Sequence, residues 1–192
     1  MAYGLGASKV IEIEGARRLT RIVYEKNIRP ACAALDLLFR LACRADGFGF
    51  ALVHSAMVSV ARTMGEASYG RLAWLISECE DLQAKTSSLQ LINQLVVSAP
   101  DDTARQQLLL KLKRRLGFDL LLSAQLHLQD PAFQEQVQVY QQVANVRIPG
   151  SWEDANFYLF KSKRSAEELK EAHGRLNRPS GRSHGLVAAR SV

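Results

Sequence analysis

The chain has 192 residues, of which 47% are hydrophobic and 23% charged, and its formal net charge is +6. This length and apolar content are enough for one sizeable core without support from metals or disulfides. The three cysteines lack metal-ligand spacing, so the sequence predicts reduced thiols in a cytoplasmic protein rather than a zinc cluster or a disulfide framework. No apolar run approaches the roughly 20 residues of a membrane span, and no signal-peptide pattern opens the chain.

Most of the positive charge belongs to the C-terminal end. Eight basic and three acidic residues lie from Lys161 onward, which leaves a net charge of +1 for residues 1–160. A nucleic-acid-binding domain would carry its basic residues on the folded body, among stacking aromatics. We therefore expect no nucleic-acid partner, and we expect residues 161–192 to form a charged helix followed by a disordered basic tail.

The first residues carry weak structural signals, and residues 1–15 are expected to be a flexible N-terminus. The segment 4–9 resembles a phosphate-binding loop but lacks its preceding strand and full glycine spacing. Residues 10–14 alternate between apolar and acidic side chains, which predicts one short strand at most. Helical periodicity begins at Ala16 and predicts a short helix that ends near Asn27.

Three further helices are predicted up to residue 79. Pro30 suits the first turn of a helix that ends near residues 46–47, because its missing N–H costs nothing there. Residues 50–64 carry an apolar stripe that Gly65 stops, and residues 68–79 carry a shorter one. Each of these helices is too short and too amphipathic to stand alone, so each must bury its stripe against a neighbour.

The segment 81–98 is the most informative helix of the sequence. Its apolar face is interrupted by the polar residues Gln90 and Asn93. Amides beside an apolar stripe indicate either an exposed groove or core amides whose hydrogen bonds are satisfied within the fold. The apolar positions of this face are Leu82, Leu89, Ile92, Leu95 and Val96.

Three more helices are predicted after the break at residues 99–102. Asp101 or Asp102 can cap a helix that runs to residue 116, where Gly117 closes it. Residues 118–128 follow as an apolar helix. Asp130 then caps a helix with proline at its first position.

The fold class that this pattern predicts is all-α, with about eight short helices stacked as a short right-handed armadillo-like solenoid over residues 16–160. A compact helical bundle is the alternative arrangement. The helical phase predicts ten largely buried side chains: Leu37, Leu41, Val60, Leu75, Ile92, Leu95, Leu109, Leu121, Val137 and Tyr140.

No constellation of side chains predicts catalysis. Two of the four histidines lie singly in helices, at His54 and His127, and the other two lie near the C-terminal end. A nucleophile, a base and an orienting group that could converge are not evident. We therefore expect a protein that is not an enzyme, with no catalytic residues, metal site or cofactor.

Several runs resemble the regulatory region of formins, known as the third formin homology or diaphanous inhibitory domain. They cover roughly residues 30–156, in the same order and spacing as in that family. The runs are ALDLLFRLACRADGFGFALVHSAMVSVARTMGE from Ala34, YGRLAWLISECEDL from Tyr69, LQLINQLV from Leu89, LLLKLKRRLGFDLLLSAQ from Leu108 and QVQVY from Gln136.

The resemblance implies an armadillo-type solenoid whose groove binds an amphipathic autoregulatory helix of a formin, with release by a Rho-family GTPase. By position, Lys85, Gln90 and Asn93 match the groove-lining residues of that family. Arg40 and Cys43 depart from it, because the groove is usually small and apolar there. A buried or half-buried Arg40 would select ligands that offer a carboxylate at the facing position.

Two alternatives remain open from the sequence. An engulfment-protein-like armadillo scaffold would share the same helical pattern with a different partner. A truncated fragment without its own activity is the other, because too few residues precede Pro30 for a GTPase-binding segment and nothing resembles an actin-assembling region. The formin interpretation predicts a cytoplasmic, cytoskeleton-associated module that cannot nucleate actin by itself.

Overall fold

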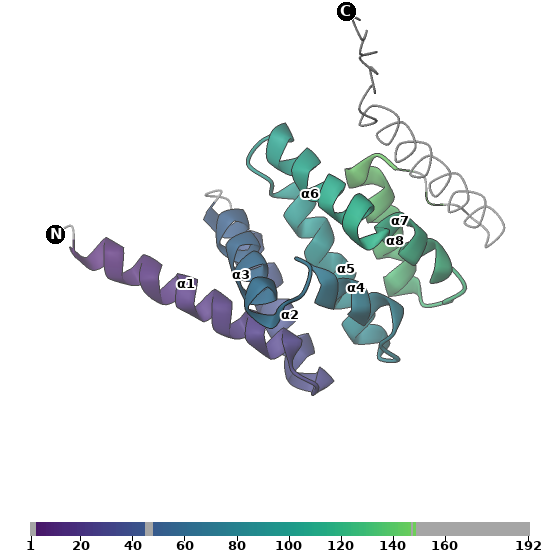
Figure 1. Ribbon diagram of the computed structural model, residues 1–192. Helices are drawn as coiled ribbons and strands as arrows, with labels where there is room; N and C mark the ends of the chain where they lie inside the picture. Colours follow the sequence, from purple (N-terminus) through teal and green to yellow (C-terminus); the bar gives the residue numbers. More distant parts are fainter. Residues whose placement is uncertain (1–2, 45–47, 147, 149–192) are drawn as a thin grey trace, which may run out of the picture. The chain divides into compact units, whose positions relative to one another are not determined.

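The computed structural model describes residues 3–44, 48–146 and 148, and the side chains from Val10 onward. Within these ranges the regular secondary structure is entirely helical, as predicted, and Figure 1 shows the helices in chain order. The predicted charged helix and basic tail lie outside the described residues. The helices are α1 Tyr3–Tyr24, α2 Ile28–Ala42, α3 Phe48–Met64, α4 Gly70–Ser77, α5 Leu82–Val97, α6 Asp102–Leu116, α7 Phe118–Ala124 and α8 Pro131–Ala144.

Aspartate caps set the start of three helices, and the sequence predicts two of them, at Asp101 and Asp130. The carboxylates of Asp81, Asp101 and Asp130 each accept the backbone N–H three residues later, at 2.7 to 2.9 Å. Each cap satisfies a donor that the helix itself cannot, which stabilises the fold by about 1 kcal/mol. Gly117 closes α6 with φ of 59°, in the left-handed region that glycine adopts without strain.

The first helix differs from its prediction. Helix α1 is continuous from Tyr3, so the strand expected over residues 10–14 is wrong, and the helix does not begin at Ala16. Its buried residues Ala16, Thr20 and Val23 pack where α1 contacts α2 and α3. The apolar residues of the alternating segment are exposed on the surface of α1. Their alternation with acidic residues therefore does not mark the buried face of a strand.

Three helices begin or end at other residues than predicted. Helix α4 begins at Gly70 because Tyr69, with φ of 68°, is in a left-handed conformation that cannot continue a helix. Helix α7 ends at Ala124 rather than near residue 128, and turns lead from there to the cap of α8. Helix α2 ends at Ala42, before the predicted stop at residues 46–47.

The helices stack in a repeating order. Helix α2 packs against α5, and α5 packs against α8, so that every third helix joins a common ladder. Helix α4 similarly packs against α7. Contacts between every third helix therefore recur along the chain, as they do in a helical solenoid.

The buried core confirms six of the ten predicted side chains and corrects the rest. Leu37 is 48% exposed, so the predicted face of α2 is wrong there. Helix α2 instead buries three alanines with Leu35 and Leu38, and alanines add little to an apolar pattern. Leu41, Leu109 and Leu121 are half-buried. The confirmed residues are Val60, Leu75, Ile92, Leu95, Val137 and Tyr140.

Candidate partner-binding site

A surface depression of about 190 Å³ crosses the ladder formed by α2, α5 and α8. Four of its lining residues come from α5 at helical spacings of three, four and seven residues, which places them on one face. The lining mixes amides with apolar side chains. It consists of Phe39 from α2, of Gln90, Asn93, Gln94 and Val97 from α5, and of Gln136 and Val139 from α8.

Asn93 joins α5 to α8 at this depression and is only 3% exposed. Its Nδ2 donates to the backbone oxygen of Gln136 at 2.9 Å and to Gln136 Oε1 at 3.1 Å. Both partners are acceptors, which fixes the orientation of the Asn93 amide. Its Oδ1 is buried and has no hydrogen-bond partner among the described residues. Such an unsatisfied acceptor costs about 1–3 kcal/mol.

Lys85 does not line the depression. Its side chain is buried within the stack, and its Nζ donates to Ile76 O at 2.6 Å, to Ser77 O at 3.2 Å and to Gln125 Oε1 at 2.9 Å. Burial lowers the pKa of Lys85 from its ordinary value. Two of these acceptors are carbonyls of the last turn of α4, and the third follows α7. Lys85 therefore connects α5 with the end of α4 and with the residue that follows α7.

Arg40 and Cys43 are both exposed. The expectation of a buried or half-buried guanidinium is wrong, because Arg40 points outward and its Nε lies 2.9 Å from the carboxylate of Asp36. An exposed pair at this helical spacing contributes about 0.3–0.5 kcal/mol. Cys43 follows the last residue of α2, where its backbone N–H donates to Phe39 O at 3.0 Å.

Of the five predicted site residues, the structure brings Gln90 and Asn93 together at the depression. Sequence reasoning missed the other lining residues. Gln94 and Val97 could have been found, because they share the helical face of Gln90. Gln136 and Val139 could not, because the register of α8 against α5 has no signal in a single sequence.

The two described histidines have local structural contacts. His54 stacks on Phe50, with ring centroids 5.1 Å apart, and its Nδ1 is hydrogen-bonded to the hydroxyl of Tyr69. Burial, and then the positive charge of Lys111, lower the pKa of His54 from its ordinary value of 6.5. His127 is exposed, with its Nδ1 2.8 Å from Ala124 O.

Two other kinds of feature are absent from the described residues. No cluster of three or more histidine, cysteine, aspartate or glutamate side chains in this part of the chain could hold a metal ion. None of the described helices combines the length and the apolar character needed to cross a bilayer.

Comparison with known proteins supports the formin resemblance. The family model of the FHOD1/3 FH3 domain matches residues 1–118, which include α1 to α6 and both Gln90 and Asn93. Formin-G of Dictyostelium discoideum is 29% identical over 152 residues, covering 78% of this chain and 14% of that protein. The chain thus spans a small part of that relative's length. These matches favour a formin over an engulfment-type scaffold, and the chain belongs to the FHOD1/3 FH3 domain family, whose members are regulatory, non-catalytic modules of formins.

Proposed function

We propose that the depression across α2, α5 and α8 binds an amphipathic helix of a formin-type autoregulatory segment. By holding that helix, the module keeps a formin inactive in the cytoplasm, and a Rho-family GTPase releases it to allow actin assembly. The observation that carries this proposal is the mixed apolar and amide lining of the depression, to which Asn93 contributes.

The lining suits a helix laid across the ladder. Phe39, Val97 and Val139 offer apolar contacts from three successive helices, so the apolar stripe of a ligand helix can touch all three. Helix-in-groove recognition uses such anchors at spacings of three, four and seven residues. The amides of Gln90 and Gln94 can then fix the register of the ligand by hydrogen bonding.

Asn93 indicates one feature of the ligand. Its Oδ1 needs a donor, and its Nδ2 is already occupied by Gln136. Asn93 Oδ1 is buried, so a ligand N–H or O–H group would remove the penalty of the unsatisfied acceptor only after the Asn93 side chain shifts to expose that oxygen. A carboxylate in the same place would face an oxygen and would be disfavoured. Acidic residues of the ligand are therefore expected beside the depression rather than above Asn93.

The test is titration calorimetry of an amphipathic peptide, with the sequence of a formin autoregulatory helix, against matched variants. Val97 is 52% exposed, so Val97→Asp should leave the fold intact and weaken binding at least tenfold, about 1.4 kcal/mol. The control is Leu110→Asp on α6, at a residue that is 46% exposed and does not line this depression. Equal affinities for both variants and the unchanged protein would refute the proposed site.

Two further variants test its details. Asn93→Asp should weaken binding, because a carboxylate cannot donate to the two acceptors of Gln136 and so disturbs the lining of the depression. Circular dichroism must accompany this variant, since Asn93 also joins two helices. Arg40→Ala should strengthen binding less than it would if the guanidinium of Arg40 were buried, because the exposed guanidinium loses little hydration when a ligand binds. A tenfold gain would show that Arg40 does obstruct the ligand.

The link to a GTPase is tested by competition. A labelled peptide bound to the module is titrated with an activated Rho-family GTPase, and its anisotropy should fall as the peptide is displaced. The same GTPase in its GDP-bound form is the control. Retention of the peptide at saturating GTPase would separate helix binding from GTPase control and refute the second part of the proposal.

A further inference from the structure

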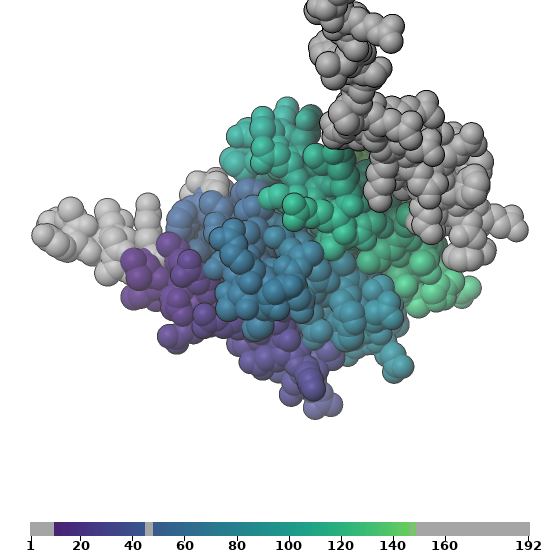
Figure 2. All heavy atoms as spheres, viewed as in Figure 1, coloured from purple at the N-terminus to yellow at the C-terminus, as the bar shows by residue number. Residues whose placement is uncertain are grey.

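A second depression lies on a different set of helices, between α6, α7 and α8. It measures about 190 Å³ and does not share a lining residue with the first. This volume is below the roughly 300–1,000 Å³ of small-molecule sites, so it suits one inserted side chain. The outer side of α6 belongs to the surface seen in Figure 2. The lining includes Leu109, Leu110 and Lys113 of α6, Asp119 of α7, Tyr140 of α8 and Val146.

Apolar side chains make up much of this lining. Leu110 is 46% exposed, and Leu109 and Val146 are half-buried, so part of their apolar surface stays uncovered. The polar atoms nearby are engaged with one another, because Asp119 accepts the hydroxyl of Tyr140 at 3.2 Å and lies 3.5 Å from Lys113 Nζ. An apolar or aromatic side chain inserted here would cover the leucines without leaving a polar group unpaired.

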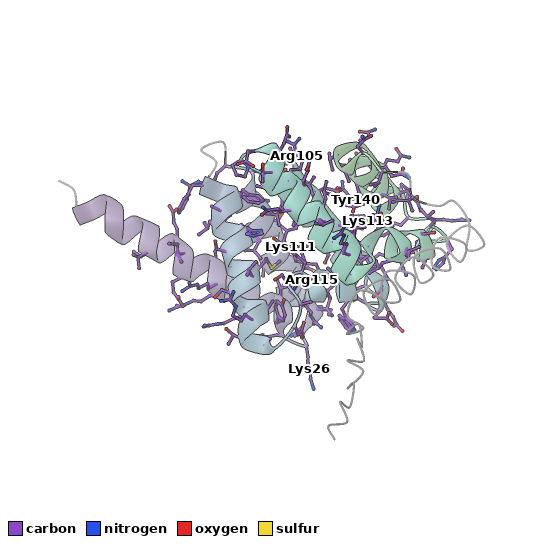
Figure 3. All side chains as sticks on the ribbon, turned by 45° about the horizontal axis from the view of Figure 1, so that its top comes forward. Lys26, Arg105, Lys111, Lys113, Arg115 and Tyr140 are labelled. Carbon is purple, nitrogen blue, oxygen red and sulfur yellow. The ribbon has the colours of Figure 1, made fainter. Side chains whose placement is uncertain are left out.

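The helix that borders the depression is strongly basic. Helix α6 carries five basic residues and one acidic residue, Asp102, which lies 3.2 Å from Arg105. The other four basic residues belong to its second half: Lys111, Lys113, Arg114 and Arg115. Figure 3 shows three of them along α6, with Tyr140 of α8 near Lys113. An uncompensated positive charge of this kind attracts an acidic partner.

The apolar surface and the positive charge meet on one face of α6. Leu110, Lys113 and Arg114 are neighbours there, because residues three and four apart share a helix face. The side chain of Lys113 is 66% exposed, and the exposed Arg114 has no ion pair with another described residue. The carboxylate of Asp119 does little to oppose an acidic ligand, because its side chain is only 17% exposed and already faces Lys113.

We infer that this face binds an acidic peptide segment of a partner protein. An apolar or aromatic side chain of the segment fills the depression beside Leu110, and the carboxylates that flank it pair with Lys113 and Arg114. This site is separate from the one proposed for the autoregulatory helix, so the module holds two different ligands on two sets of helices.

The geometry favours a peptide over two other polyanions. A single-stranded nucleic acid binds by stacking its bases on aromatic side chains, but Tyr140 is only 1% exposed and cannot offer its ring. A membrane surface receives apolar side chains that protrude from a basic helix, whereas here the apolar surface lines a depression. A depression receives a side chain from the partner instead.

Fluorescence anisotropy of the full chain tests the inference, with a labelled peptide in which one phenylalanine is flanked by glutamates. Leu110→Asp and Arg114→Glu should each weaken binding about tenfold, and added salt should weaken it further. Both residues are exposed, so both variants should fold, which circular dichroism checks. Two matched controls should change the affinity less than about twofold. They are Val97→Asp, at the first depression, and Lys26→Glu, which makes the same change in charge at an exposed residue outside α6.

Each result decides one way. Absence of peptide binding, or equal losses for Arg114→Glu and Lys26→Glu, would show that α6 holds no specific site and would overturn the inference. Binding to phosphatidylserine vesicles in place of the peptide would assign the face to a membrane, and a dimer that Leu110→Asp dissociates would assign it to a second copy; either would also overturn it. Because Val97→Asp and Leu110→Asp exchange roles as variant and control, failure of this inference is distinguishable from failure of the proposed helix-binding function.

Discussion

Lys85 provides the sharpest distinction between a binding residue and a structural one. Lys85→Met keeps the length of the side chain and removes three hydrogen bonds from a buried ammonium. Each acceptor left without a donor costs about 1–3 kcal/mol, while removal of a buried charge returns part of that cost. We expect a net loss of about 3 kcal/mol in the free energy of unfolding, or roughly 6–12 °C in Tm.

Urea unfolding followed by circular dichroism measures this loss. Lys26→Met is the matched control, because Lys26 is an exposed lysine, and it should change stability by less than about 0.5 kcal/mol. A loss below about 1 kcal/mol for Lys85→Met would refute the structural role. If peptide affinity fell while stability stayed constant, Lys85 would instead be the groove residue that its sequence position suggests.

Three other outcomes are expected. In the folded state the pKa of His54 is lowered below 6.5, so the unfolded chain binds that proton first as the pH falls. The free energy of unfolding should therefore decrease as the pH drops through about 6.5. His54→Gln should reduce this decrease, as measured by denaturation at pH 7.5 and at pH 5.5. Asp101→Ala should cost about 1 kcal/mol in urea unfolding through loss of the cap of α6, and no loss would show that the cap is redundant. Leu95→Ala should cost about 2–5 kcal/mol and Leu37→Ala less than about 0.5, and equal losses would contradict the observed face of α2.

Helix boundaries were predictable where a local signal was strong. Asp81, Asp101 and Asp130 accept hydrogen bonds from nearby backbone, so the information for those starts lies within four residues. The N-terminal helix lacked such a signal, and its contacts with α2 and α3 decide its conformation. Local patterns therefore predicted the class of fold and most of its elements. Where those patterns were weak, tertiary packing determined the conformation of the segment.

The candidate site was predictable only on one helix. Gln90 and Asn93 stood out as amides in an apolar stripe, and the structure places both at the depression. Lys85 lies on the same helix but points into the layer of α4 and α7, a direction that depends on which neighbours surround α5. Arg40 was expected to be buried, and its exposure follows from the alanine-rich face by which α2 packs.

The position of α5 explains why stability and binding are difficult to separate in this module. This helix contacts α2, α4, α6 and α8, and its buried polar residues hold two of those neighbours. Asn93 fixes α8 through Gln136, which also lines the depression. A ligand that satisfies Asn93 Oδ1 therefore acts on the junction that sets the spacing of α5 and α8. Since Val97 of α5 and Val139 of α8 both line the depression, occupancy of the depression and rigidity of the ladder should strengthen one another.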